Sequence, residues 1–297
     1  MSVPELRMVE RVRMWTQLGI RFRDAAFDLP VTHPLKVHAW LPGAAQAPVR
    51  AVVGPGGVYS FHGLPGQVND PDASGPPLEY VISVEDPAGL YLPLAFSVTL
   101  PLGYRGEFLS ATTGSPPGAP GHAYLFAAPG RRVPPGAAAI RADLVDYDTG
   151  EPAAWAVLRA TLDGREAVGI ADGRGRVLLL APQPDADGLG LGSPPGTGAG
   201  TPAAQEWPVT LRVDWQPAAL RFPFAAGAAL PASWQARPSL RSIFEQDPAL
   251  VVVDEGDAPA EDWVADLGFG TELVLRSRDA AGAPTSNVWI TAGASIP

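Results

Sequence analysis

The sequence predicts an all-β protein built from two tandem antiparallel β-sandwich domains with short terminal helices. Three observations support this fold class. Apolar and polar residues alternate over short segments, as expected of strands that bury one face. The 33 glycines and 34 prolines among the 297 residues separate these segments as turns. The order of strands and turns recurs at an offset of about 120 residues, which suits a duplicated sandwich domain.

The stretch from Ile140 to Gln183 shows the predicted unit most clearly. Residues 140–146 alternate in polarity and are followed by turn residues at 148–152. A second strand is predicted over 155–162, and the Asp163-Gly164 pair that follows is a strong hairpin signal. The chain then returns over 168–171, turns at 172–175 and enters the apolar run 177–180. We therefore expect antiparallel strands joined by tight turns.

The same series of strands and turns begins at Ile20. Its first part, residues 20–61, matches 140–180 in order and spacing, and the segments 78–86 and 92–96 match 206–214 and 221–225. Residues 124–127 are predicted to close the first domain with one more strand. We therefore assign residues 20–130 to a first β-sandwich domain and residues 131–297 to a second.

The remaining segments lie at the two ends and in one long loop. Residues 1–19 form an N-terminal arm with an amphipathic helix over 6–18, which is either a free arm or docks onto a neighbouring subunit. The Gly/Pro-rich loop 185–205 is expected to be mobile or to be ordered by a partner. The second domain ends in a helix-strand extension, with a helix over 239–246 capped by Ser239, and strands over 271–276 and 288–291. These strands complete the second domain or add to the sheet edge of another chain.

Composition excludes several classes of function. The chain has no cysteine, so disulfides, thiol nucleophiles and cysteine metal sites are excluded. The formal charge of -10 argues against nucleic-acid binding, which needs a basic surface. Charged residues interrupt the first 19 positions, and no run of about 18 apolar residues occurs. We therefore expect cytoplasmic synthesis without a signal peptide and no membrane insertion.

Residue spacing gives little support for catalysis or metal binding. His33 and His38 are five apart in a predicted strand and would point to opposite faces. His62 and His122 are isolated, and no serine lies in a nucleophile-elbow pattern. The acidic residues Asp143, Asp146, Asp148 and Asp172 occupy ordinary turn positions, although they leave calcium binding open. We predict a protein that is not an enzyme, with no catalytic residue, no metal and no cofactor.

Tryptophans are the remaining candidates for ligand or partner contact. Most are scattered one per predicted element, as expected of core or edge residues. Trp207 and Trp215 are eight apart, so their side chains would share one face of a strand. Two aromatic rings on one exposed face would form a platform for a sugar. We therefore name Trp207 and Trp215 as the candidate contact residues.

Two family resemblances narrow the fold and the function. Asp146 to Pro152 and the hairpin Ile170 to Pro182 resemble the carboxypeptidase-regulatory-like or transthyretin-like β-sandwich, an Ig-like architecture, and 57–65 is a looser copy. Such modules are usually non-catalytic. The paired arrangement resembles accessory proteins of phage-tail-like contractile injection systems, on segments 20–26, 57–66, 92–101 with 104–106, and 140–146.

The second resemblance implies a structural or adaptor subunit of such a particle, at the baseplate, cap or sheath. Its expected partners are other particle subunits, such as tube, sheath, baseplate or cap proteins. We also expect a homo-oligomer around a symmetric axis. The alternative is a carbohydrate-binding or adhesive β-sandwich module, supported by the tryptophans and the acidic turns.

Overall fold

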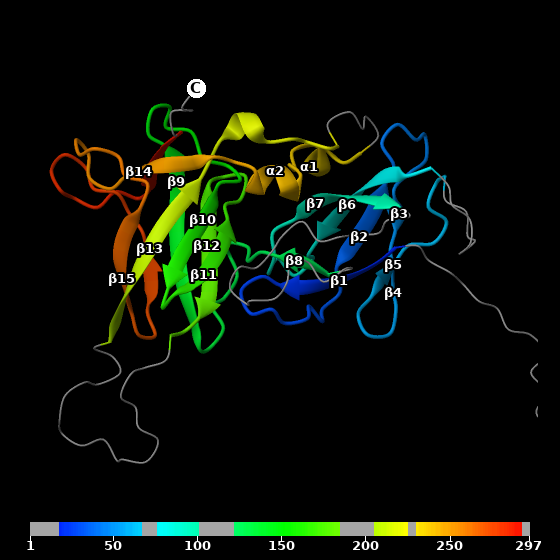
Figure 1. Cartoon of the computed structure of the whole chain (residues 1–297), viewed down its shortest axis with the longest axis horizontal. Coiled ribbons are helices and arrows are strands. Elements are labelled where there is room, and N and C mark those ends of the chain that lie inside the picture. Colours follow the sequence, from blue (N-terminus) through cyan, green and yellow to red (C-terminus); the bar gives the residue numbers. More distant parts are fainter. Residues whose placement is uncertain (1–17, 67–75, 101–121, 185–204, 225–229, 293–297) are drawn as a thin grey trace, which may run out of the picture.

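The computed structural model describes residues 18–66, 76–100, 122–184, 205–224 and 230–292 (Figure 1). Within these residues the chain is mostly β-structure, as the sequence predicts. The N-terminal arm up to residue 17 and the loop 185–204 lie outside the described residues, so the expectations about them stay predictions. No helix in the described part of the chain is long and apolar enough to cross a membrane.

Residues 18–130, here called the first half, contain two sheets of four strands (Figure 1). The orders are β4-β5-β1-β8 and β3-β2-β6-β7. The strands are β1 (Gly19–Asp24), β2 (Lys36–Trp40), β3 (Val49–Arg50), β4 (Val52–Val53), β5 (Tyr59–Ser60), β6 (Leu78–Glu85), β7 (Leu94–Leu100) and β8 (His122–Leu125).

Residues 131–292, the second half, contain one sheet of nine strands in the order β11-β10-β13-β14-β17-β9-β12, with β15 paired to β13 and β16 to β9. The strands are β9 (Ala137–Asp146), β10 (Val157–Leu162), β11 (Arg165–Ile170), β12 (Arg176–Pro182), β13 (Glu206–Asp214), β14 (Pro248–Val252), β15 (Trp263–Gly268), β16 (Glu272–Val274) and β17 (Val288–Ala292). A 3-10 turn (Pro217–Ala219) and the short helices α1 (Ala232–Gln235) and α2 (Leu240–Phe244) lie between β13 and β14.

Both halves use the same pairing order. In the first half, β1 pairs antiparallel with β5, and β2 pairs antiparallel with β3 and β6, which in turn pairs with β7. In the second half, β9 pairs antiparallel with β12, and β10 pairs antiparallel with β11 and β13, which pairs with β14. In each half the first strand also has a parallel partner, β8 for β1 and β17 for β9.

Three details differ from the sequence prediction. The sheets are not purely antiparallel, because β8, β16 and β17 run parallel to their partners. Residues 221–224 form no strand, and by its pairing with β13 the counterpart of β7 is β14. The strands β14 and β15 were not expected, since Asp247-Pro248 reads as a helix stop and 263–268 is interrupted by Ala, Asp and Gly.

Local turn and cap signals are confirmed by the backbone. Asp163 and Gly164 have φ values of 50° and 70°, the left-handed conformation that a two-residue type I′ hairpin requires. The side chain of Ser239 accepts a hydrogen bond from the backbone N of Ser242 at 3.2 Å, which caps α2 as predicted. These signals are short-range, so the local sequence is sufficient to specify them.

The hydrophobic core forms two large clusters. One fills the first half and also takes in Val157, Ile170, Leu240 and Ile243 from the second half. The other is made by residues of the second half alone. Side chains of the second half therefore complete the packing of the first half, so the two are joined by apolar contact as well as by the chain.

Gly175 is the glycine whose replacement we expect to cost most. Its φ is +78°, and an added Cβ would overlap the carbonyl oxygen of Leu144. Gly164 has a similar φ of +70° but nothing within 4 Å of its added Cβ. Gly164→Ala should therefore lower the free energy of unfolding by about 1–2 kcal/mol through backbone strain alone. Gly175→Ala should lower it by clearly more, as measured by urea unfolding; equal losses would contradict the overlap.

Candidate functional site

The connection between β13 and β14 lies across the first half, and we call its described residues 215–224 and 230–247 the clamp. Figure 1 shows α1 and α2 of this segment beside β6 and β7. A backbone bridge joins Ser239 to Ala95 of β7. One apolar cluster contains residues of both parts, namely Trp40, Val81, Ala95, Phe224, Leu230 and Trp234.

The burial pattern of β6 explains why the clamp is needed. Five consecutive residues of this strand, 80–84, are buried, whereas a strand with one solvated face alternates. Tyr80, Ile82 and Val84 face the main core of the first half, and Val81 faces the clamp. The run of apolar residues in 78–84 is a sequence signal for a strand covered on both faces.

Arg237 is the polar centre of the clamp. Its side chain is 3% exposed, and its Nη1 donates to Ser83 Oγ at 2.7 Å. Its Nη2 donates to Glu85 Oε1 at 3.0 Å, and the indole Nε1 of Trp234 donates to the same oxygen at 2.9 Å. One carboxylate of β6 thus accepts from two clamp side chains, which fixes the position of α1 against the sheet.

Burial and hydrogen bonding shift the pKa values of these groups. Burial raises the pKa of Glu85, but the hydrogen bonds from Arg237 and Trp234 outweigh it, so the net pKa is lowered. Burial lowers the pKa of Arg237 against the opposing effect of Glu85. His38 packs its ring 5.3 Å from that of Trp234, and burial lowers its pKa as well. The ion pair is therefore formed at neutral pH.

A second set of hydrogen bonds holds the base of the clamp to the second half. Gln246 Nε2 donates to the backbone oxygen of Trp155 at 2.8 Å, and its Oε1 accepts from the backbone N of Gln216 at 3.0 Å. Trp155 itself has a φ of 63°, an unusual conformation for a bulky residue. Gln246 thus links Trp155 to the clamp.

A groove of about 580 Å³ opens between the clamp and the second half. Its walls are largely apolar and include Trp155, Trp215, Leu220 and Phe222. The Nε1 of Trp215 is buried and donates to no acceptor among the described residues. An apolar groove with aromatic walls can hold an extended chain or a sugar ring.

The predicted pair Trp207 and Trp215 does not form a platform. Both side chains face the same side of β13, as their even spacing requires, but this side is the core of the second half. Trp215 is 7% exposed, and Trp207 packs against Phe269 with the ring centroids 6.2 Å apart. At about 3.3 Å per residue they lie roughly 26 Å apart. Of the two, Trp215 lines the groove described above.

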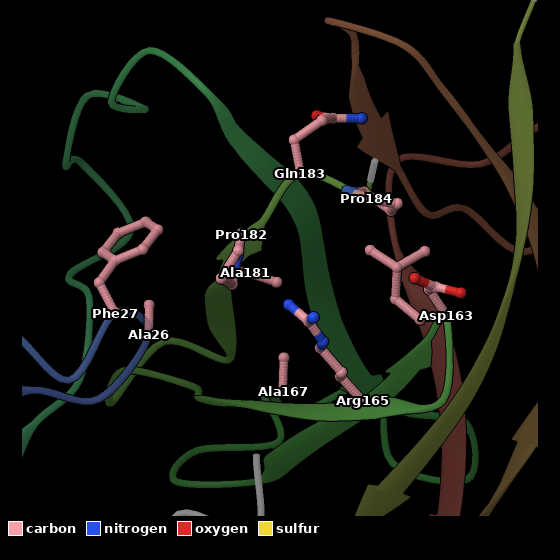
Figure 2. Close-up of a pocket in the computed structure, with 10 residues that line it drawn as sticks. Ala26, Phe27, Asp163, Arg165, Ala167, Ala181, Pro182, Gln183 and Pro184 are labelled. Atoms are coloured by element: carbon pink, nitrogen blue, oxygen red, sulfur yellow. The ribbon is translucent and has the colours of Figure 1, made fainter. Parts of the chain in front are cut away.

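A smaller pocket of about 160 Å³ lies on another side of the junction between the halves (Figure 2). Ala26 and Phe27 of the first half form one wall, and the hairpin residues Asp163 and Arg165 form another. The segment 181–184 closes it. No sequence pattern indicated this pocket, because its residues come from segments more than 130 positions apart.

The outer face of the sheet containing β1 carries a groove of about 590 Å³ with basic side chains. Arg21 of β1 and His122 of β8 are register partners there, and His33 lines the same groove. The Nδ1 of His122 is buried without an acceptor among the described residues. This groove is a local concentration of basic residues in a chain of net charge -10.

The carboxylates of the acidic turns accept hydrogen bonds from groups of their own turns. Asp146 accepts from Thr149 Oγ1 at 2.7 Å, and Asp172 accepts from the backbone N of Arg174 at 2.8 Å and from Arg176 Nη2 at 2.7 Å. Within the described ranges, no three His, Cys, Asp or Glu side chains gather in a way that could hold a metal ion. These carboxylates stabilise the turns predicted for them.

No protein-family model matches the chain, and no curated protein matches it. Among solved structures it is similar to the shaft pilin SpaA from Lactobacillus rhamnosus GG, at 10% sequence identity over 94% of this chain and 98% of the pilin, with a TM-score of 0.24. A mutant of the same pilin gives 11% identity over 94% of this chain and 100% of that chain, also with a TM-score of 0.24. Scores this low carry no argument about function.

We expect the buried ion pair of the clamp to contribute measurably to stability. Arg237→Met roughly keeps the volume of the side chain but leaves Ser83 without this donor and Glu85 with the hydrogen bond from Trp234, so the free energy of unfolding should fall by about 2 kcal/mol. The control Arg241→Met, in the same segment but 70% exposed, should change it by less than about 0.5 kcal/mol. A double-mutant cycle with Glu85→Gln should give a coupling above about 1 kcal/mol, and additive losses would contradict the pairing.

The lowered pKa of Glu85 gives a pH dependence of known sign. Its ordinary value is 4.5, and the folded value lies below this. The stability that Glu85 contributes is therefore present above pH 4.5 and is lost as the pH falls through the folded pKa. The difference in unfolding free energy between wild type and Glu85→Gln should shrink between pH 6 and roughly pH 3. A constant difference across this range would show that Glu85 titrates normally.

Proposed function

We propose that this chain is a non-catalytic structural or adaptor subunit of a phage-tail-like contractile injection particle, at its baseplate, cap or sheath. The clamp is the observation that carries the proposal. It joins the two halves through a shared apolar cluster and a buried ion pair, so that the protein can act as a stiff spacer between partners. The family resemblance supplies the kind of particle.

We further propose that the two halves are tandem β-sandwich domains of common origin. Their shared pairing order, with a parallel partner for the first strand of each, supports this. The clamp is then an insertion in the second domain at the point where the first domain connects β6 to β7 directly.

Buried polar groups support a structural role over a catalytic one. Asp24 is 4% exposed and accepts from Tyr91 at 2.8 Å and from Arg131 at 2.6 Å. Asp214 is 8% exposed and pairs with Arg159 at 2.6 Å. Each of these carboxylates is held by a cation that stabilises the packing around it, as in a structural network.

Sheet edges supply the surfaces for contact with particle subunits or with further copies of this chain. The strands β4, β15 and β16 lie at the margins of the described sheets, and each carries an exposed valine. Val52, Val264 and Val274 are 58%, 61% and 50% exposed. An edge strand with free backbone groups can accept a strand from another chain, and the basic groove at Arg21 and His122 suits an acidic partner.

The adhesive alternative is favoured by one observation, the groove lined by Trp155 and Trp215. Its aromatic residues differ from the pair predicted from spacing, because Trp207 is not among them. A sugar would stack on the partly exposed ring of Trp155.

The mass of native complexes tests the proposal. We expect the tagged chain, isolated from its source cells under mild conditions, to elute with tube, sheath or baseplate proteins in a complex of far higher mass than 31.0 kDa. Subunits identified by mass spectrometry would name the position in the particle. A free monomer would contradict the assembly role. If that monomer bound a glycan array and Trp155→Ala abolished the binding while Trp207→Ala did not, the adhesive function would replace it.

A further inference from the structure

The pocket between the halves has two walls of different chemistry. Figure 2 shows Phe27 and Ala26 on one side, with Ala181 and Pro182 between them and the hairpin of the second half. These side chains are apolar. The polar residues that line the pocket are Asp163, Arg165 and Gln183. The pocket is therefore an apolar recess with a few polar groups at its rim, the usual composition of a ligand site.

Its positively charged group, the guanidinium of Arg165, has no ion-pair partner among the described residues. Figure 2 shows the guanidinium of Arg165 extending into the recess toward Ala181. Arg165 makes no ion pair with the described residues, unlike Arg159, Arg176 and Arg212, whose guanidinium groups each contact a carboxylate. Asp163 lines the same pocket, but the two side chains form no ion pair with each other in the described part of the chain.

The pocket also contains an amide, that of Gln183. The Nε2 of Gln183 is buried and donates to no acceptor among the described residues. A buried donor without an acceptor is costly and is normally satisfied by a partner or a ligand. Because the Gln183 amide points away from Arg165 in Figure 2, the guanidinium of Arg165 is the group that offers N–H donors to an acceptor in the recess.

We propose that this pocket binds a single carboxylate carried on a short apolar stem. A guanidinium matches a carboxylate through two parallel hydrogen bonds. The stem lies against Phe27 and Ala181. The volume of about 160 Å³ is below the roughly 300–1,000 Å³ of sites for drug-sized ligands, so the ligand is a small acid or one acidic side chain.

Two sources can supply this carboxylate: a free small acid, or a glutamate or C-terminal residue of a partner chain. The chemistry of recognition is the same in both cases. The site does not depend on the proposed function, since a pocket that binds acids is compatible with a free protein as well as with an assembled subunit. A failure of the particle assay would therefore leave this inference standing.

The test uses the full chain with isotope-labelled arginine and glutamine side chains. Propionate, a peptide Ala-Glu-Ala blocked at both ends, and the same peptide with Gln in place of Glu are titrated while the NMR signals of Arg165 Nε and Gln183 Nε2 are followed. Saturable shifts with propionate alone identify a free acid as the ligand. Saturable shifts with the Glu peptide and not the Gln peptide identify a partner side chain. No shift with any of them overturns the proposal.

Three variants separate the site from general charge attraction. Arg165→Gln should weaken binding at least tenfold, because the charged donor is lost. Arg174→Gln removes a similarly exposed arginine of a neighbouring turn and should leave the affinity unchanged. Asp163→Asn keeps the turn chemistry and removes a nearby negative charge, so it should tighten binding. Equal affinity in Arg165→Gln and wild type would overturn the site.

Discussion

The arrangement of the two halves depends on the contacts that the buried guanidinium of Arg237 makes with Ser83 and Glu85. A cation without water is costly unless acceptors surround it, and here both acceptors, Ser83 and Glu85, belong to β6 of the first half. The donor belongs to the second half. The ion pair is therefore satisfied only when the clamp lies in one position against the sheet, which gives the apolar contacts around Trp234 a defined register.

The two halves share a pairing order, but they differ in how far each forms its hydrophobic core from its own residues. The second half has a hydrophobic core formed by its own residues, whereas the first half draws Leu240 and Ile243 into its core and needs the clamp to cover Val81 and Ala95. Without the clamp, the outer face of β6 would be exposed to water. The two halves and the clamp are thus held together by shared packing.

The sequence predicts features that depend on neighbouring residues and does not predict contacts between segments far apart in the chain. The alternation at 140–146 and the Asp163-Gly164 turn need only neighbouring residues, and both appear as expected. Parallel pairing of β9 with β17 joins residues about 145 positions apart, and no short-range pattern encodes it. The spacing of Trp207 and Trp215 gives their common face but not its burial, which depends on the strands packed opposite. The pocket at Arg165 was not predicted either, because its walls come from segments that are distant in the sequence.

The parallel pairs β1/β8 and β9/β17 also determine how each half would carry mechanical load. β1 and β8 lie side by side and point the same way over four register pairs, and β9 and β17 do so over three. A pull on the chain entering β1 and leaving β8 acts along the strands in opposite directions, so all the bonds between them are sheared together. An antiparallel hairpin pulled at its open end would instead open one bond at a time. The topology therefore suits a body under tension along its chain axis.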